Sequence, residues 1–136
     1  MENPLIAGNW KMNYTSKEAT ELVSQIKPTL EKVTDVETII CPPFTALSTV
    51  KRILEGSRIK IGAQDVFHEK HGAYTGEISP TMLTEFCQYV ILGHSERRQL
   101  LSETDTSVSL KIESALKSGL RPIMCVGETL KYRNQG

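Results

Sequence analysis

Residues 89–98, YVILGHSERR, contain an apolar run that ends at a glycine and is followed at once by a histidine, a hydroxyl group and three charges. The consecutive branched residues 90–92 are typical of a strand that is covered on both faces of a sheet. Ser95 and Glu96 suit the first turn of a helix. We therefore expect a buried strand, a turn and a helix, with His94 between the strand and the helix.

His94 would then lie at a helix N-terminus, where free backbone N–H groups and the helix dipole make the potential positive and disfavour an imidazolium. A neutral histidine can donate an N–H to a developing oxyanion without giving up its proton, so we expect an electrophile rather than a base. The alternative is that His94 only caps the helix. This stretch alone does not decide between the two.

The composition is that of an ordinary globular protein, and we expect one domain over residues 1–136. Hydrophobic residues make up 39% and charged residues 24%, and 16 basic side chains balance 16 acidic ones. This balance argues against binding nucleic acid or an anionic membrane through broad attraction, and it favours a small ligand held by a few placed groups. No apolar run reaches the roughly 18 residues of a membrane helix, and residues 1–4 have no basic segment typical of a leader.

The three cysteines, Cys41, Cys87 and Cys125, are odd in number and lack the spacing of metal ligands. They lie in or beside apolar runs, which predicts reduced thiols in a cytoplasmic setting. Residues 64–77 form a long polar loop, and loops of this length often have a function. His68 and His71 in this loop could suggest a metal, but no third ligand is evident, so surface histidines are the simpler interpretation.

Apolar strand-like runs begin near residues 5, 37, 59, 89 and 121, with a helical pattern after each of the first four. Spacings of about 22 to 32 residues are typical of strand-helix units and predict a parallel sheet with helices outside. Such a sheet is either open and doubly wound or closed into a barrel. No glycine-rich phosphate loop follows any strand, and polar groups cluster after the first and fourth strands, which favours the barrel.

Two of the helical patterns carry clear end signals. Thr15 and Glu18 have the spacing of a capping box at the first helix, and Pro28 is expected to end or bend that helix. The helix predicted over residues 104–118 should end at Gly119. Its inward face is predicted to consist of four apolar residues: Val108, Ile112, Ala115 and Leu116.

Asn9 and Lys11 follow the first strand directly and stand two residues apart. If the chain stays extended, their side chains point the same way, one able to hydrogen-bond and the other carrying a point charge. Such a pair suits a phosphorylated substrate. The alternative is a solvated loop in which Lys11 is an ordinary surface lysine.

Five segments in order along the chain resemble the triosephosphate isomerase family: AGNWKMN (7–13), GAQD (62–65), GAYTGEIS (72–79), GHSERR (93–98) and CVGE (125–128). The resemblance implies an α/β fold, the (β/α)8 TIM barrel, of which this chain would supply roughly strands one to five. It also implies interconversion of dihydroxyacetone phosphate and D-glyceraldehyde 3-phosphate through an enediolate, with no cofactor and no metal. This reaction serves glycolysis and gluconeogenesis.

The same resemblance implies roles for individual residues. Lys11 would bind the substrate dianion, Asn9 would hydrogen-bond a substrate oxygen, and His94 would polarise the carbonyl and shuttle protons. Glu96 would hold Lys11. Supporting roles would fall to four more residues: Ser95 starting the helix, Cys125 packing beneath the site, and Arg98 and Glu103 forming an ion pair.

Residues 64–79 resemble the loop through which the family forms homodimers. Gln64, Tyr74, Thr75 and Glu77 would lie at that interface, with Thr75 reaching the neighbouring subunit near its Asn9 and Glu96. A small phosphorylated triose and a second copy of the chain are therefore the expected partners.

The departure from the family pattern lies after the fifth strand. In the family the glutamate base and the closing lid follow strand six, and further phosphate-binding backbone follows strands seven and eight. Glu128 lies on a stretch that does not match the base-bearing segment. We therefore expect no turnover from this chain alone, with the first and fifth strands as unpaired edges. The alternatives are a non-catalytic barrel fragment that assembles with another chain, and a different phosphosugar-binding barrel.

Overall fold

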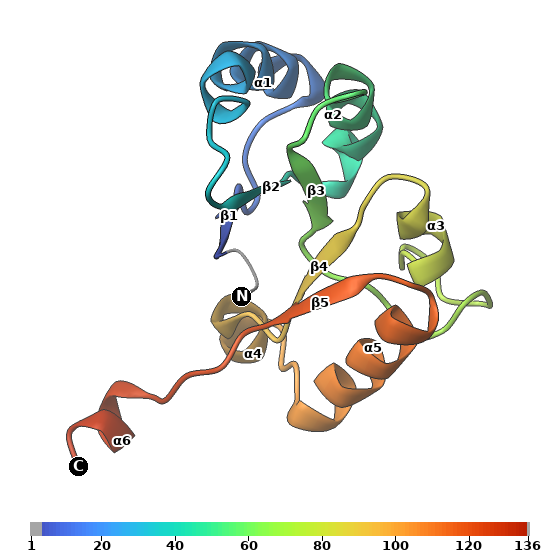
Figure 1. Cartoon of the computed structure of the whole chain (residues 1–136). Helices are drawn as coiled ribbons and strands as arrows, with labels where there is room; N and C mark the ends of the chain where they lie inside the picture. The colour runs from blue at the N-terminus through green and yellow to red at the C-terminus, as the bar shows by residue number, and fades with distance from the viewer. Residues whose placement is uncertain (1–3, 136) are drawn as a thin grey trace.

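A parallel sheet of five strands in the order β1-β2-β3-β4-β5 organises the computed structural model, which describes residues 4–135. The strands are β1 (Leu5–Asn9), β2 (Glu37–Cys41), β3 (Lys60–Ala63), β4 (Tyr89–Leu92) and β5 (Arg121–Met124). Every neighbouring pair is parallel and follows chain order. Figure 1 shows the strands as an arc with α1, α2, α3 and α5 outside it. A sheet wound in one direction with helices outside is the arrangement of a barrel, not of a doubly wound sheet.

The helices are α1 (Ser16–Leu30), the 3-10 turn η1 (Phe44–Ala46), α2 (Leu47–Ile53), α3 (Pro80–Thr84), α4 (Ser95–Leu100), α5 (Asp105–Lys117) and α6 (Leu130–Arg133). Within the described residues, none of them is long and apolar enough to cross a membrane. The last of them, α6, projects away from the other elements at the red end of the chain in Figure 1.

The predicted capping box at the start of α1 is present. The Thr15 hydroxyl accepts a hydrogen bond from the Glu18 amide, and the Glu18 carboxylate accepts one from the Thr15 amide. Of the two predicted effects of Pro28, an end or a bend of the helix, the end is not observed, since α1 continues to Leu30. Pro28 lies in the last turn and removes only one backbone hydrogen bond there. The neighbouring Lys27 Nζ donates to the Ile53 carbonyl oxygen of α2 at 2.9 Å, which ties this turn to the next helix.

The helix α5 begins and ends as predicted, and three of the four residues predicted to face inward do so: Val108 and Ala115 are buried and Ile112 is half-buried. Gly119 has φ +85°, and the Leu120 amide donates to the Ala115 carbonyl at 3.0 Å, a Schellman ending. Leu116 is 58% exposed, so its predicted inward position is wrong, whereas Lys111 is buried. Lys111 faces inward because its ammonium finds two buried carboxylates, described below.

The strand β4 is buried on both faces of the sheet, which explains its uninterrupted apolar run. On the helix side, Val90 and Leu92 pack with the helix residues Val23, Val50 and Val108. The opposite face carries a second cluster of buried residues: Ile39, Cys41, Tyr89 and Ile91, with Ala7, Ile123 and Cys125 half-buried against them. All three cysteines are free, as predicted.

The two outer strands leave the sheet open. The partner of β1 is β2 and that of β5 is β4, so each has one unpaired edge, as predicted. Ile6 on β1 is 60% exposed and Met124 on β5 is 53% exposed. Apolar side chains are thus exposed at both open edges of the sheet.

Candidate functional site

The candidate site lies at the carboxyl ends of the strands, the rim where parallel barrels carry their polar groups. Asn9 is the last residue of β1, and His94 follows β4 after Gly93. Although far apart in sequence, these two segments are joined by a 2.5 Å contact between Lys11 Nζ and Glu96 Oε1. The structure therefore brings Asn9, Lys11, His94 and Glu96 to one rim.

Lys11 is held from two sides. Its backbone amide donates to Asn9 Oδ1 at 2.9 Å, and its φ of +55° is a left-handed conformation that non-glycine residues seldom adopt. About half of the Lys11 side chain stays exposed, so the ammonium remains open to a ligand. The hydrogen bond from Lys11 lowers the pKa of the Glu96 carboxyl below its ordinary value. Glu96 is thus an ionised partner of Lys11.

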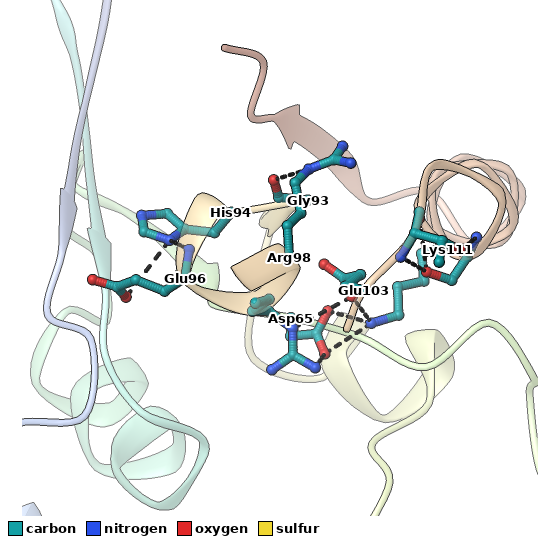
Figure 2. A network of polar contacts seen from close by, with 10 residues as sticks. Asp65, Gly93, His94, Glu96, Arg98, Glu103 and Lys111 are labelled. Carbon is teal, nitrogen blue, oxygen red and sulfur yellow. Dashed lines mark hydrogen bonds and ion pairs between the residues drawn. The ribbon is translucent and has the colours of Figure 1, made fainter. Parts of the chain in front are cut away.

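His94 is the N-cap residue of α4, between strand and helix as predicted. Its Nδ1 accepts the backbone amide of Glu96 at 3.2 Å. A ring nitrogen that accepts a hydrogen bond carries no proton, so a neutral His94 has its proton on Nε2. Figure 2 shows this ring beside Glu96, on the far side of α4 from the buried carboxylates. Because the first turn of α4 occupies Nδ1, Nε2–H is the donor that the ring has left for a ligand.

The start of α4 is fixed by Gly93 and Arg98. Gly93 has φ +70°, and a Cβ there would come within 2.9 Å of the Arg98 guanidinium and 3.2 Å of Val108. Arg98 Nε donates to the Gly93 carbonyl oxygen at 2.8 Å. The predicted ion pair between Arg98 and Glu103 is not formed, because Arg98 binds Asp105 at 2.5 Å. Its neighbour Arg97 contacts Glu103 instead.

Four charged side chains form a network on the side of α4 away from His94. Those of Asp65, Glu103 and Lys111 are buried (Figure 2), and that of Arg97 is 32% exposed. Lys111 Nζ lies 2.8 Å from Asp65 Oδ1 and also binds Glu103, while Arg97 lies 2.8 Å from Asp65. Burial raises the pKa of Glu103, but its bonds to Lys111 and Arg97 outweigh burial and hold the pKa below its ordinary value. Lys111 was not recognisable as buried from its polarity, although it stands at helical spacing from Val108 and Ala115.

Two residues with predicted supporting roles, Ser95 and Cys125, lie on different elements. Ser95 is the first residue of α4. Cys125 is half-buried, its amide donates to the Leu92 carbonyl oxygen at 2.8 Å, and burial raises the pKa of its thiol. It therefore packs against the strand that leads to His94.

The loop between β3 and α3 carries the four residues predicted at an interface. Gln64 turns inward and donates to the Cys41 carbonyl oxygen at 2.8 Å. Tyr74, Thr75 and Glu77 are exposed, and the Tyr74 ring rests on Phe67 with 4.6 Å between centroids. Within residues 4–135, no group of histidine, cysteine or acidic side chains is arranged to hold a metal ion.

Residues 4–136 match the family model for triosephosphate isomerase. The chain belongs to the triosephosphate isomerase family. It is 55% identical over 136 residues to the triosephosphate isomerase of Dehalococcoides mccartyi strain CBDB1, covering all of this chain and 54% of that protein. It is 54% identical over 134 residues to that of Alkaliphilus oremlandii, covering 98% of this chain and 54% of that protein.

A solved structure gives the same result for the fold. The crystal structure of triosephosphate isomerase from Bartonella henselae superposes with a TM-score of 0.92 at 41% identity, covering 98% of this chain and 56% of that chain. The five strands are thus a half-barrel that matches part of the TIM barrel, as predicted. The chain spans about half the length of the curated triosephosphate isomerases that it matches.

Proposed function

We propose that this chain supplies the substrate-binding and electrophilic side of a triosephosphate isomerase site, which interconverts dihydroxyacetone phosphate and D-glyceraldehyde 3-phosphate through an enediolate. The observation that carries the proposal is the meeting of Asn9, Lys11, His94 and Glu96 at one strand-end rim. Residues 1–136 would form the N-terminal part of a single barrel domain.

Lys11 binds the phosphate dianion of the triose and stabilises the charge that develops during the reaction. Its ammonium is a compact point charge, suited to a doubly charged phosphate, and Glu96 fixes its position. Asn9 uses Oδ1 to hold the Lys11 backbone, which leaves its Nδ2 group to donate to a substrate oxygen.

His94 polarises the substrate carbonyl. With Nδ1 occupied by the Glu96 amide, Nε2–H is the group that can donate to a carbonyl oxygen as it gains negative charge. Nε2 can give its proton to one enediolate oxygen and take a proton back from the hydroxyl on the other, so the imidazole returns to its neutral form.

The abstraction of the carbon-bound proton needs a base, and Glu96 is unsuited to it. A carboxylate that is bonded to Lys11 and has a lowered pKa is a weak proton acceptor. We therefore assign this step to a glutamate carried by further strands of the barrel. Activity on this proposal belongs to the complete barrel, and the chain alone is inactive.

We further propose a homodimer formed through residues 64–79 in a cytoplasmic enzyme. The exposure of Tyr74, Thr75 and Glu77 on a loop between β3 and α3 supports this interface. The free cysteines are compatible with a reducing compartment.

A coupled assay of glyceraldehyde 3-phosphate isomerisation tests the proposal. The chain is measured alone and after mixing with a polypeptide that corresponds to the unmatched part of the Dehalococcoides mccartyi relative. We expect turnover only from the mixture, and Lys11→Ala should lower both the rate and the affinity for triose phosphate. The matched control is Lys17→Ala, an exposed lysine of α1.

Turnover by the chain alone would contradict the assignment of the base to further strands. Assembly of the two polypeptides without activity would favour the second candidate function, a non-catalytic barrel fragment. The open edges of β1 and β5 are the observation that favours that alternative.

A further inference from the structure

The helix α4 provides the first turn that holds His94, but apolar packing does not keep this helix in place. It has six residues, and none of them is buried. Neither of the two apolar clusters of the half-barrel contains a residue of α4. A helix of this length is not stable by itself. Its position therefore depends on the chain on either side of it and on the polar contacts of its side chains.

Two of these polar contacts are exposed ion pairs. Glu96 meets Lys11, and about half of each side chain is open to solvent. Arg98 meets Asp105, whose side chain is 94% exposed, and it also donates to the carbonyl oxygen of Gly93 within the same stretch of chain. Exposed ion pairs stabilise a structure little, because water screens the charges.

Arg97 differs from these residues because its partners are buried. Its guanidinium lies 2.8 Å from Asp65 Oδ2 and 3.4 Å from Glu103 Oε1, and the side chains of these two acids are 8% and 4% exposed. Glu103 follows α4 closely along the chain, whereas Asp65 belongs to the segment that follows β3. Asp65 is thus the buried anchor of α4 that comes from a separate part of the fold.

Asp65 is itself held firmly. Lys111 Nζ of α5 donates to both of its carboxylate oxygens, at 2.8 and 3.0 Å. Hydrogen bonds between charged groups are the strong ones, so this carboxylate keeps one orientation toward Arg97.

The segment that carries Asp65 is also bound to the other side of the site. The preceding residue, Gln64, donates to the Cys41 carbonyl oxygen, which accepts the Trp10 amide at 3.1 Å as well. Trp10 directly precedes Lys11. Residues 64 and 65 therefore connect the segment of the phosphate-binding lysine with the helix of the electrophile.

The effect of Asp65 reaches His94 through the first turn of α4. The Arg97 amide donates to the His94 carbonyl oxygen at 2.9 Å, and the Glu96 amide donates to His94 Nδ1 at 3.2 Å. Figure 2 shows Asp65 and the His94 ring on opposite sides of this helix. Asp65 can therefore act on the ring only through Arg97 and the backbone.

We propose that Asp65 is a positioning residue for the isomerase reaction, because its buried carboxylate holds Arg97 and with it the turn that directs His94 Nε2–H at the substrate. This inference rests on the function proposed above. It assigns Asp65 no contact with the substrate and no part in proton transfer.

Asp65→Asn tests the proposal in the barrel completed with the complementary polypeptide. The amide keeps the shape of the side chain but removes the charge that holds the guanidinium. We expect kcat for glyceraldehyde 3-phosphate to fall at least about tenfold, because small displacements of a catalytic group are costly. KM should change less than about twofold, since Lys11 still binds the phosphate. Asp105→Asn is the matched control, because Asp105 pairs with the adjacent arginine of α4 but is exposed, and its kcat should stay within about twofold of the parent.

A second comparison separates positioning from a general loss of structure. In a His94→Ala background, Asp65→Asn should lower kcat little further, because no ring is left to direct. The same fall in both backgrounds would overturn the proposal, and so would an equal fall in Asp105→Asn.

The ring nitrogens of His94 give a readout that needs no turnover. With isotope-labelled histidine in this chain, NMR of the parent assembly at neutral pH should show the neutral ring protonated on Nε2, and Asp65→Asn should give a mixture of the two tautomers. The spectrum of His94→Ala identifies the His94 resonances. If Asp65→Asn does not assemble, Arg97→Gln breaks the same contact while Lys111 still pairs with Asp65, and it should give the same mixture. An inactive parent assembly would contradict the isomerase function, whereas unchanged His94 tautomers in these variants would overturn the positioning role.

Discussion

At the scale of single residues, His94 combines a fixed ring with a free donor. The Glu96 amide holds Nδ1, so the ring cannot turn without losing that bond, and Nε2–H keeps one direction. Groups that are already oriented before the reaction stabilise developing charge without reorganising, which is the source of most electrostatic catalysis. The cap interpretation and the electrophile interpretation of this residue are therefore compatible.

We expect His94→Gln to lower kcat by about 10²- to 10³-fold in the complemented barrel, the usual cost of removing one donor to an oxyanion. KM should change little, because the phosphate is bound by Lys11. Steady-state kinetics with glyceraldehyde 3-phosphate separates the two constants. A rise in KM at unchanged kcat would show that His94 only binds substrate or caps α4.

The lowered pKa of Glu103 predicts that the fold loses stability in acid. Its pKa in the folded chain is held below the ordinary value of 4.5 by Lys111 and Arg97, against the effect of burial. A carboxyl group with a lowered folded pKa stabilises the fold above its unfolded pKa, and this contribution is lost as the pH falls through the folded pKa. The free energy of unfolding should therefore decline below about pH 4.5.

Urea unfolding at neutral pH and at two pH values below 4.5 measures this decline. Glu103→Gln should lower stability at neutral pH and flatten the acid decline, because the amide does not titrate there. Glu21→Gln, at an exposed position of α1, is the control. An acid decline of the same steepness in Glu103→Gln and in the parent would mean that other carboxyl groups cause it.

At the scale of helices and strands, the ends of helices could be predicted from the sequence, whereas the partners in ion pairs could not. Thr15 and Glu18 predicted the start of α1 because both groups of a capping box lie within one turn. Arg97 and Arg98 are adjacent and chemically identical, but they point about 100° apart on a helix. Only the tertiary arrangement, which puts Asp65 and Glu103 beside Arg97 and Asp105 beside Arg98, decides which of them meets Glu103.

The burial of Lys111 could not be predicted from the sequence, for a related reason. Sequence polarity places lysine outside and leucine inside, whereas α5 buries Lys111 and exposes Leu116. Two carboxylates from other segments, Asp65 and Glu103, reverse this preference by pairing with the ammonium. Likewise Pro28 is a strong local stop signal that the packing of α1 overrides.

The network that Lys111 completes joins the loop after β3 to α4 and α5. We expect Lys111→Met to lower the free energy of unfolding by about 3–5 kcal/mol, because it removes the buried cation from two buried carboxylates and leaves them only the partly exposed Arg97. Lys117→Met removes an exposed partner of Glu113 on the same helix and should change stability little. Urea unfolding of both variants measures the two losses in the free energy of unfolding. Equal losses would show that the buried network stabilises the fold no more than an exposed ion pair does.

At the scale of the whole molecule, the sheet is half of a closed surface. The family match and the TM-score of 0.92 show that these strands follow a barrel, yet β1 and β5 each expose one edge. An unpaired parallel edge offers backbone N–H and C=O groups to any strand that fits, and exposed apolar side chains strengthen the attraction. The half-barrel should therefore associate with itself or with a complementary half.

We expect the isolated chain to migrate above its 15.2 kDa mass in size-exclusion chromatography with light scattering, and to form a one-to-one assembly when the complementary polypeptide is added. Ile6→Lys together with Met124→Lys should suppress self-association, because a lysine on each edge strand opposes pairing. Ser109→Lys adds a charge at an exposed position of α5 and should leave association unchanged. If the double variant associates as strongly as the parent, the open edges are not what holds the copies together, and the loop of residues 64–79 becomes the surface to test next by Thr75→Arg.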